Sequence, residues 1–139
     1  MGRTFKSCRG QNQFEISDLN SASALKSQIS NLELVACDTD PDAVSLAREN
    51  AYLNGVDGII NFQVGTIPSD GSVFDFVCAN LTLDVIVPIL PMLLSTATKT
   101  LVLSGILIEQ KDEIVKALGP SRFEIVEAGE WMRVVVNKS

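Results

Sequence analysis

The feature that most constrains this chain is a short apolar strand that ends in a carboxylate and leads directly into a helix. Residues Glu33–Cys37 are mostly aliphatic or small and are followed at once by Asp38. Asp40 is a residue type favoured at a helix N-cap, and Pro41 is favoured at the first helical position. In nucleotide-binding folds, an acid at the carboxyl end of a strand accepts hydrogen bonds from ribose hydroxyls. Asp38 is therefore a candidate ribose ligand; the alternative is a water-exposed carboxylate that caps the next helix.

From residue 32 onward, strand patterns alternate with helix patterns, and the last two strands read as a hairpin. Such alternation predicts a mostly parallel sheet with helices on both faces, to which the hairpin adds an antiparallel edge. The predicted fold class is therefore doubly wound α/β. We expect strands at Glu33–Cys37, Ile59–Val64, Val73–Ala79 and Thr100–Leu103, helices from Pro41 to Asn54 and over Glu109–Leu118, and a hairpin of Phe123–Glu127 with Trp131–Asn137.

The run Asp84–Leu94 is helical in pattern but contains Pro88 and Pro91. A proline inside a helix lacks the amide hydrogen and clashes with the preceding turn. We therefore predict two short helices, of which the second begins near one of the two prolines.

Composition limits the class of partner. The chain has 139 residues, which fits one domain, and its net charge is −6 with no basic tract. Nucleic acid and acidic membrane surfaces are therefore poor candidate partners. The apolar run Val85–Leu94 is also too short to span a bilayer. With no histidine and three widely spaced cysteines, the sequence has no recognisable metal site.

Two of the three cysteines, Cys37 and Cys78, fall inside apolar strand patterns, whereas Cys8 lies near the start of the chain. Small buried thiols are common in such strands. We therefore expect reduced core cysteines and a cytoplasmic location. An organelle transit peptide at the basic start of the chain is the alternative.

Several short motifs follow one another in a fixed order between Leu34 and Asn137. They are Asp38-Thr39-Asp40-Pro41-Asp42-Ala43-Val44, Ala47-Arg48-Glu49-Asn50 with Leu53-Asn54-Gly55, Ala79-Asn80-Leu81 with Asp84-Val85, Leu103-Ser104-Gly105-Ile106-Leu107 with Glu109-Gln110, and Gly129-Glu130-Trp131. In this order and spacing they resemble the C-terminal catalytic domain of the ribosomal protein L11 methyltransferase family. The resemblance covers about three quarters of the chain.

This resemblance implies a Rossmann-like class I fold that uses S-adenosylmethionine. It also implies a protein substrate, methylated on a lysine or α-amino group, with ribosomal protein L11 as the candidate. In the family's pattern Asp38 binds the ribose hydroxyls, and Asn80 binds both the methionine part of the cofactor and the incoming amine, which makes it the candidate catalytic residue. Gly65 and Thr66 let the adenine approach the backbone. The alternatives are a backbone turn after a strand for Gly65 and Gly105, and a turn residue bonded to its own backbone for Asn80.

Two parts of the family's pattern are not found in this sequence. No glycine occurs between Gly10 and Gly55, although a glycine-rich turn is expected before Asp38. The candidate for the central first strand is Phe14–Ser17, which is less apolar than a central parallel strand normally is. Direct pairing of the two neighbouring strands, or a strand from another chain, are the alternatives. We expect a divergent segment over residues 1–31 and a methyltransferase-like domain over residues 32–139, without the family's separate N-terminal recognition domain.

Three classes of function follow from these observations. They are a methyltransferase with full or impaired activity, a remnant that keeps the sheet but binds no cofactor, and an interaction module. A nicotinamide-dependent dehydrogenase is the other enzyme class, because an acid after the second strand binds ribose there as well. That class needs the same glycines, and the motifs around Asn80 and Trp131 favour the methyltransferase.

Overall fold

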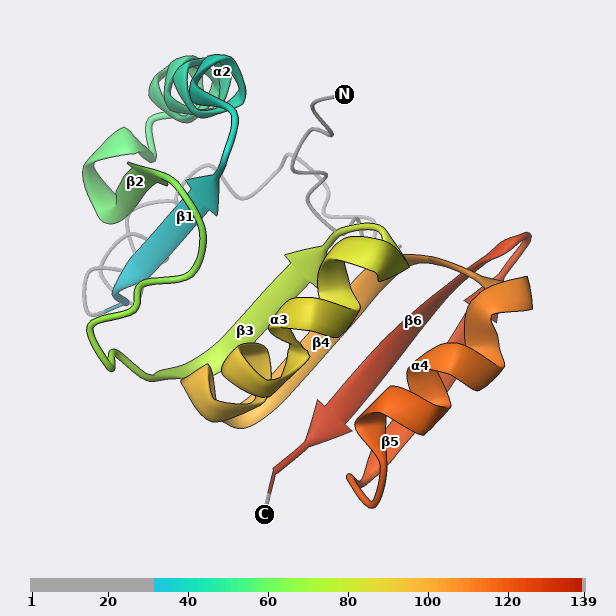
Figure 1. Cartoon of the computed structure of the whole chain (residues 1–139). Coiled ribbons are helices and arrows are strands. Elements are labelled where there is room, and N and C mark those ends of the chain that lie inside the picture. The colour runs from blue at the N-terminus through green and yellow to red at the C-terminus, as the bar shows by residue number, and fades with distance from the viewer. Residues whose placement is uncertain (1–31, 139) are drawn as a thin grey trace, which may run out of the picture. The chain divides into compact units, whose positions relative to one another are not determined.

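The computed structural model describes residues 32–138. The chain divides into two compact units, one ending at Thr66 and the other beginning at Ile67, and each is described here by itself. Figure 1 shows the helices and strands of both. The predicted central strand Phe14–Ser17 and the predicted segment 1–31 lie outside the described residues, as does Cys8.

The first unit contains a β-α-β arrangement. Strand β1 (Leu34–Asp38) leads through helix α2 (Pro41–Leu53) to strand β2 (Ile60–Val64), which pairs with β1 in parallel. The register runs without a break from Leu34 opposite Ile60 to Asp38 opposite Val64. Both strands and the helix start and end within about two residues of their expected positions, so this part of the prediction is confirmed.

The second unit is built on a sheet of four strands in the order β3-β4-β6-β5. Strand β3 (Phe74–Asn80) runs parallel to β4 (Ala97–Leu107), whereas β6 (Trp131–Asn137) is antiparallel to both β4 and β5 (Phe123–Ala128). The predicted closing hairpin is therefore confirmed. Parallel and antiparallel pairs in one α/β unit agree with the predicted fold class.

Helix α3 (Leu83–Thr96) and helix α4 (Lys111–Leu118) cover one face of this sheet (Figure 1). Their apolar side chains pack with every second residue of the central strands, and these residues form the core of the unit. Its least exposed members are Leu83, Ile86, Leu93, Leu101, Leu103, Ile106, Ile114 and Val134, each at 0 or 1% exposure. Burial of a side chain of this size contributes roughly 1.5–3 kcal/mol, so this layer holds the unit together.

The expected break at Pro88 does not occur, and the prediction of two short helices is wrong. Helix α3 continues through Pro88 and Pro91, both of which lie on its exposed side. Four buried residues on the opposite side, Leu83, Ile86, Leu90 and Leu93, contribute roughly 6–12 kcal/mol by burial. Two interior prolines cost roughly 6 kcal/mol in helix propensity. Burial therefore offsets the prolines, and the helix stays in one piece.

Strand β4 is longer than the predicted Thr100–Leu103, and Gly105 lies inside it rather than in a turn after it. The register with β6 shifts between Leu103 and Ile106, because β4 carries one more residue there than its partner. Gly105 has a φ of +84°, a conformation that glycine adopts without steric cost. The glycine thus makes a β-bulge within the strand, so the alternative of a backbone turn after the strand does not hold at this position.

The prediction of one continuous sheet differs from the described strands, which form a sheet of two strands and a sheet of four. Among residues 32–138, no strand pairs with the second edge of β1 or with the second edge of β3. On β3, Phe76 is 69% exposed and Cys78 is exposed, so Cys78 is not the core residue expected from the sequence. Cys37 on β1 is partly buried. An apolar strand pattern does not bury a side chain when no described element covers that face.

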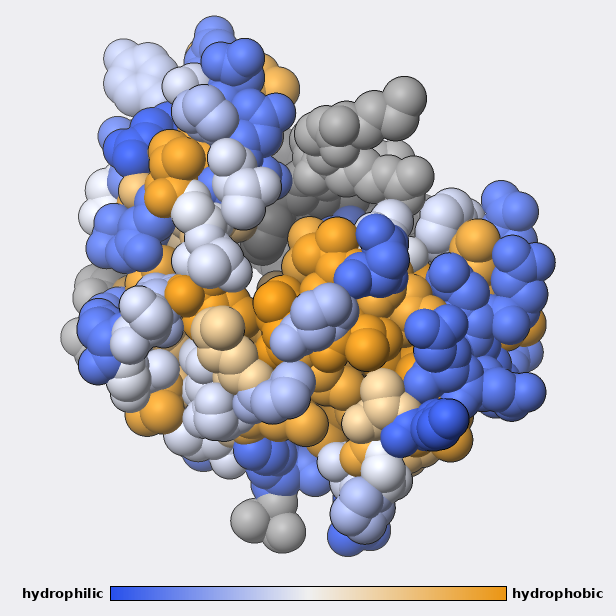
Figure 2. Space-filling model, in the orientation of Figure 1, coloured by the Kyte–Doolittle hydropathy of each residue, from blue (hydrophilic) through white to orange (hydrophobic). Residues whose placement is uncertain are grey.

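Hydrophobic residues also gather on the outward side of α3, whereas the surface of α4 is hydrophilic (Figure 2). On α3, Val85 is 44% and Met92 is 37% exposed. In the described part of the chain, no helix has the length and apolar character that crossing a membrane requires.

Candidate functional site

Asp38 occupies the carboxyl end of β1, as the sequence predicts. Its Oδ1 accepts a hydrogen bond of 2.8 Å from the backbone N–H of Asp40, and the side chain is partly buried. The same carboxylate therefore already stabilises the turn that leads into α2, whereas the cap of that helix, named as an alternative role for Asp38, comes from Asp40. A carboxylate offers about four acceptor positions, so this contact leaves capacity for two hydroxyl donors.

The turn after Asp38 is fixed by the cap of α2. The Asp40 side chain accepts a 2.9 Å hydrogen bond from the N–H of Asp42, and Pro41 takes the first helical position. Both predictions are confirmed. Because the N-terminal N–H groups of α2 face the same end of the sheet as Asp38, the cap and the carboxylate fix one loop together.

Gly65 lies directly beside Asp38 at the end of the β1–β2 pair. Its N–H donates to the backbone oxygen of Asp38 over 2.8 Å, and the chain then turns through Thr66. Gly65 has a φ of +138°, and no described atom lies within 4 Å of where a Cβ would stand. The glycine is therefore required by the backbone conformation, and the space beside it is open to a ligand.

Cys37 precedes the carboxylate, and its environment changes its acidity. Partial burial raises the pKa of the Cys37 thiol, and the negative charge of Asp38 raises it further. Both effects disfavour the thiolate, so this cysteine is a weak nucleophile at neutral pH.

Asn80 ends strand β3 in the second unit, again at the predicted position, and its side chain is exposed. Its Oδ1 accepts a hydrogen bond of 3.2 Å from the hydroxyl of Ser104 on β4. The N–H of the next residue, Leu81, donates to the Ser104 carbonyl over 3.0 Å. The side chain is thus bonded to the neighbouring strand and not to its own backbone, which was the alternative considered for it.

The two units therefore carry different parts of the predicted site. Asp38, Gly65 and Thr66 are brought together at one end of the β1–β2 pair, and Asn80 stands at the end of β3. The role of each residue stays a prediction. Sequence reasoning missed Ser104, although it directly follows an apolar strand pattern, as Asn80 does.

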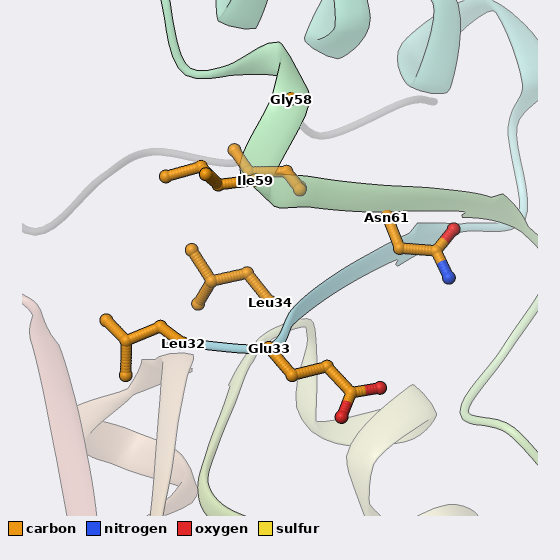
Figure 3. A pocket seen from close by; sticks show the side chains of 7 residues that line it. Leu32, Glu33, Leu34, Gly58, Ile59 and Asn61 are labelled. Carbon is orange, nitrogen blue, oxygen red and sulfur yellow. The ribbon is translucent and has the colours of Figure 1, made fainter. Parts of the chain in front are cut away.

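A pocket of about 400 Å³ lies elsewhere in the first unit, at the opposite ends of β1 and β2. Figure 3 shows the aliphatic side chains of Leu32, Leu34 and Ile59 gathered on one side, with Glu33 and Asn61 pointing away from them. Strand β1 runs over five residues from Leu34 at the rim of this pocket to Asp38, roughly 13 Å along the strand. The pocket contains none of the predicted site residues.

Residues 21–139 match the family described as ribosomal protein L11 methyltransferase (PrmA). The chain belongs to this family.

Curated proteins that are similar to this chain in sequence carry the same family name. The ribosomal protein L11 methyltransferase of Heliobacterium modesticaldum is 32% identical over 112 residues, which cover 76% of this chain and 35% of that protein. The corresponding protein of Campylobacter fetus is 39% identical over 95 residues, which cover 63% of this chain and 32% of that protein. The chain thus spans about a third of the length of the curated relatives it matches.

Solved structures give the same family and fold. The ribosomal protein L11 methylase of Lactobacillus delbrueckii subsp. bulgaricus matches with a TM-score of 0.69 and 25% identity, covering 86% of this chain and 65% of that one. An RNA methyltransferase of Salinibacter ruber, solved with S-adenosyl-L-homocysteine, matches with a TM-score of 0.56 and 22% identity, covering 75% and 65%. The second likeness shows the fold alone. The resemblance found in the sequence and the Rossmann-like fold class are both confirmed.

Proposed function

We propose that this chain is the catalytic part of an S-adenosylmethionine-dependent protein methyltransferase of the ribosomal protein L11 type. The observation that carries the proposal is the family match over residues 21–139. The relatives are named for a methyltransferase that acts on ribosomal protein L11, so L11 is the proposed substrate, through a lysine or α-amino group. The division into a divergent segment 1–31 and a methyltransferase-like domain 32–139 is part of this proposal.

The residues of the first unit fit a nucleoside. Asp38 would accept hydrogen bonds from the two ribose hydroxyls through the acceptor positions that the Asp40 contact leaves free. Gly65 and Thr66 would let the adenine approach the backbone, which the open space around the Gly65 Cα supports. Asn80 would hold the methionine part of the cofactor and the incoming amine.

The chemistry needs little from the protein beyond positioning. When bound, S-adenosylmethionine would supply an electrophilic methyl group: a neutral amine attacks it in line, the carbon–sulfur bond breaks, S-adenosylhomocysteine leaves, and the methylated nitrogen loses a proton to water. The side chain of Asn80 would orient the amine, whose N–H would donate a hydrogen bond to Oδ1. Positioning of this kind contributes roughly 7–11 kcal/mol to a displacement, so a chain without histidine can carry it out.

A second candidate function is a family remnant that binds no cofactor and serves as an interaction module. The observation that favours it is the stretch without glycine between Gly10 and Gly55, where the family has its cofactor-binding turn. Without glycine at such a turn, a Cβ would hinder the close approach of the backbone to the ligand.

Calorimetric titration of the full chain with S-adenosylmethionine and S-adenosylhomocysteine separates the two. We expect micromolar binding that Asp38→Ala weakens at least about tenfold, since hydrogen bonds to a charged group contribute roughly 1.5–3 kcal/mol each. Asp57→Ala removes an exposed carboxylate of the same unit and serves as the matched control. Binding weaker than millimolar would favour the remnant. Mass spectrometry of ribosomal protein L11 after incubation with cofactor and chain tests the substrate.

A further inference from the structure

Two consecutive residues of β4, Ser104 and Gly105, lie beside the exposed side chain of Asn80. Ser104 stands directly opposite Asn80 in the parallel register. It donates its hydroxyl hydrogen to Asn80 Oδ1 over 3.2 Å, and its carbonyl accepts from the N–H of Leu81 over 3.0 Å. A single residue of β4 therefore bonds both to the side chain of Asn80 and to the backbone that follows it.

Gly105 completes this arrangement because it has no side chain. A Cβ at this position would lie 2.6 Å from the carbonyl oxygen of Leu81 and 2.9 Å from Asn80 Oδ1. Both distances are shorter than a van der Waals contact between carbon and oxygen, so the atoms would clash. The first clash involves a backbone oxygen, which cannot rotate away as a side chain can. Any other residue at position 105 would therefore displace the Asn80 amide or the turn after it.

The β-bulge explains how both contacts arise from neighbouring residues. The extra residue of β4 between Leu103 and Ile106, together with the φ of +84° at Gly105, changes the direction of the strand just where Asn80 ends β3. Bulges commonly redirect a side chain in this way next to a functional site. The remainder of β4 then returns to regular pairing with β6.

We propose that Ser104 and Gly105 are positioning residues that fix the orientation of the Asn80 amide. The hydroxyl of Ser104 holds Oδ1 toward β4, so Nδ2 points away from β4, and Gly105 leaves the room in which Oδ1 lies. Within residues 32–138, the Asn80 side chain makes no other hydrogen bond. The importance of this orientation for ligands rests on the proposed function.

A fixed amide has a chemical consequence for what Asn80 recognises. One lone pair of Oδ1 is used by Ser104, so one acceptor position and the two N–H bonds of Nδ2 remain. Rotation of the amide by 180° would exchange donor and acceptor and would present the wrong group to an amine. By fixing the amide, Ser104 and Gly105 therefore favour a ligand that places an N–H beside Oδ1 and an acceptor beside Nδ2. A ligand with both an amine and a carboxylate, as in an amino acid, meets this requirement.

The orientation itself is tested by NMR of the Asn80 side-chain NH2 group in the full chain, assigned by its loss in Asn80→Asp. We expect the NH2 signals to shift in Ser104→Ala and to stay near their wild-type position in Ser104→Thr, which keeps the hydroxyl. Thr98→Val is the matched control, since Thr98 also bonds from β4 to β3, through its hydroxyl and Asp75 Oδ1 at 2.9 Å, at the other end of the same strand pair. Unchanged NH2 signals in Ser104→Ala would overturn the proposal.

The ligand consequence is measured separately with S-adenosylhomocysteine as the probe. We expect Ser104→Ala to weaken binding about three- to tenfold, the loss expected for one neutral hydrogen bond, with binding restored in Ser104→Thr. Gly105→Ala should weaken binding more than Ser104→Ala does if the variant folds, because its Cβ would displace Asn80 Oδ1 or the turn after it, and the Ser104 variants decide the matter if it does not. Equal binding by wild type and Ser104→Ala would overturn the positioning role. If the wild type does not bind the probe, the proposed function fails, and the NMR result alone decides whether Ser104 orients Asn80.

Discussion

Replacement of Pro88 by alanine tests why α3 is a single helix. Pro88 lies in the interior of α3 and is exposed, so Pro88→Ala removes no buried contact. In a helix the carbonyl of Asp84 accepts from the N–H of residue 88, and proline has no N–H. Alanine at position 88 supplies this missing hydrogen bond. We therefore expect the variant to be more stable than the wild type.

The expected gain can be worked out from two opposing effects. A proline in a helix interior costs roughly 3 kcal/mol relative to alanine. Proline also restricts the unfolded chain, and its removal returns roughly 0.4–1 kcal/mol of conformational freedom to that state. The net increase in the free energy of unfolding is therefore about 2 kcal/mol. With a urea dependence of roughly 1–3 kcal/mol/M, the midpoint rises by about 1 M.

Fluorescence of Trp131, the single tryptophan of the chain, follows the unfolding of the second unit in urea. Pro120→Ala is the control, because Pro120 is exposed and lies in the turn after α4, where no helical hydrogen bond is restored. We expect this control to be unchanged or slightly less stable. A lower midpoint for Pro88→Ala would refute the reasoning, because it would mean that the proline favours the native chain and that burial alone does not hold α3 together.

Three further predictions concern the first unit and the surface. Asp40→Ala should reduce the stability of α2 by about 1 kcal/mol, read as faster amide hydrogen exchange in that helix, whereas Asp40→Asn should keep the cap. Hydrogen bonds from Lys99, and then from Thr98, lower the pKa of Asp75 below its ordinary value of 3.8. The small stability difference between wild type and Asp75→Asn should therefore be present at neutral pH and vanish as the pH falls through the lowered pKa. Asp38→Asn should lower the pKa of Cys37 and speed its alkylation by iodoacetamide at pH 8, measured with the other two cysteines replaced by serine.

The elements that the sequence predicts correctly are those that local chemistry determines. The cap of α2 depends on Asp40 and Pro41, which act within one turn of the helix. The closing hairpin depends on the connection around Gly129, whose φ of +61° suits a glycine. In both cases, residues a few positions apart are sufficient, and the expected boundaries are met within about two residues.

The errors arise where residues far apart in the sequence decide the outcome. Pro88 breaks a helix in isolation, but the contacts of α3 with the sheet outweigh that preference. Gly105 is typical of a turn, yet pairing of β4 with both β3 and β6 carries the strand past it. Cys78 lies within an apolar run that is typical of a buried strand, but no described element covers the side of β3 that carries it. Its burial is decided by packing and not by the local sequence pattern.

The same distinction explains which site residues the sequence reveals. Asp38 is visible because it follows directly on an apolar strand, and a polar residue at that point lies at the carboxyl edge of a parallel sheet. Asn80 also ends a strand, but its role was inferred from the resemblance to the methyltransferase family. Ser104 acts only through its register opposite Asn80, which no motif states. Its position can still be derived once two strands are known to be parallel neighbours, because their carboxyl ends must lie side by side. A polar residue at the end of one such strand is then the first place to look for the group that orients the ligand-binding residue on the other.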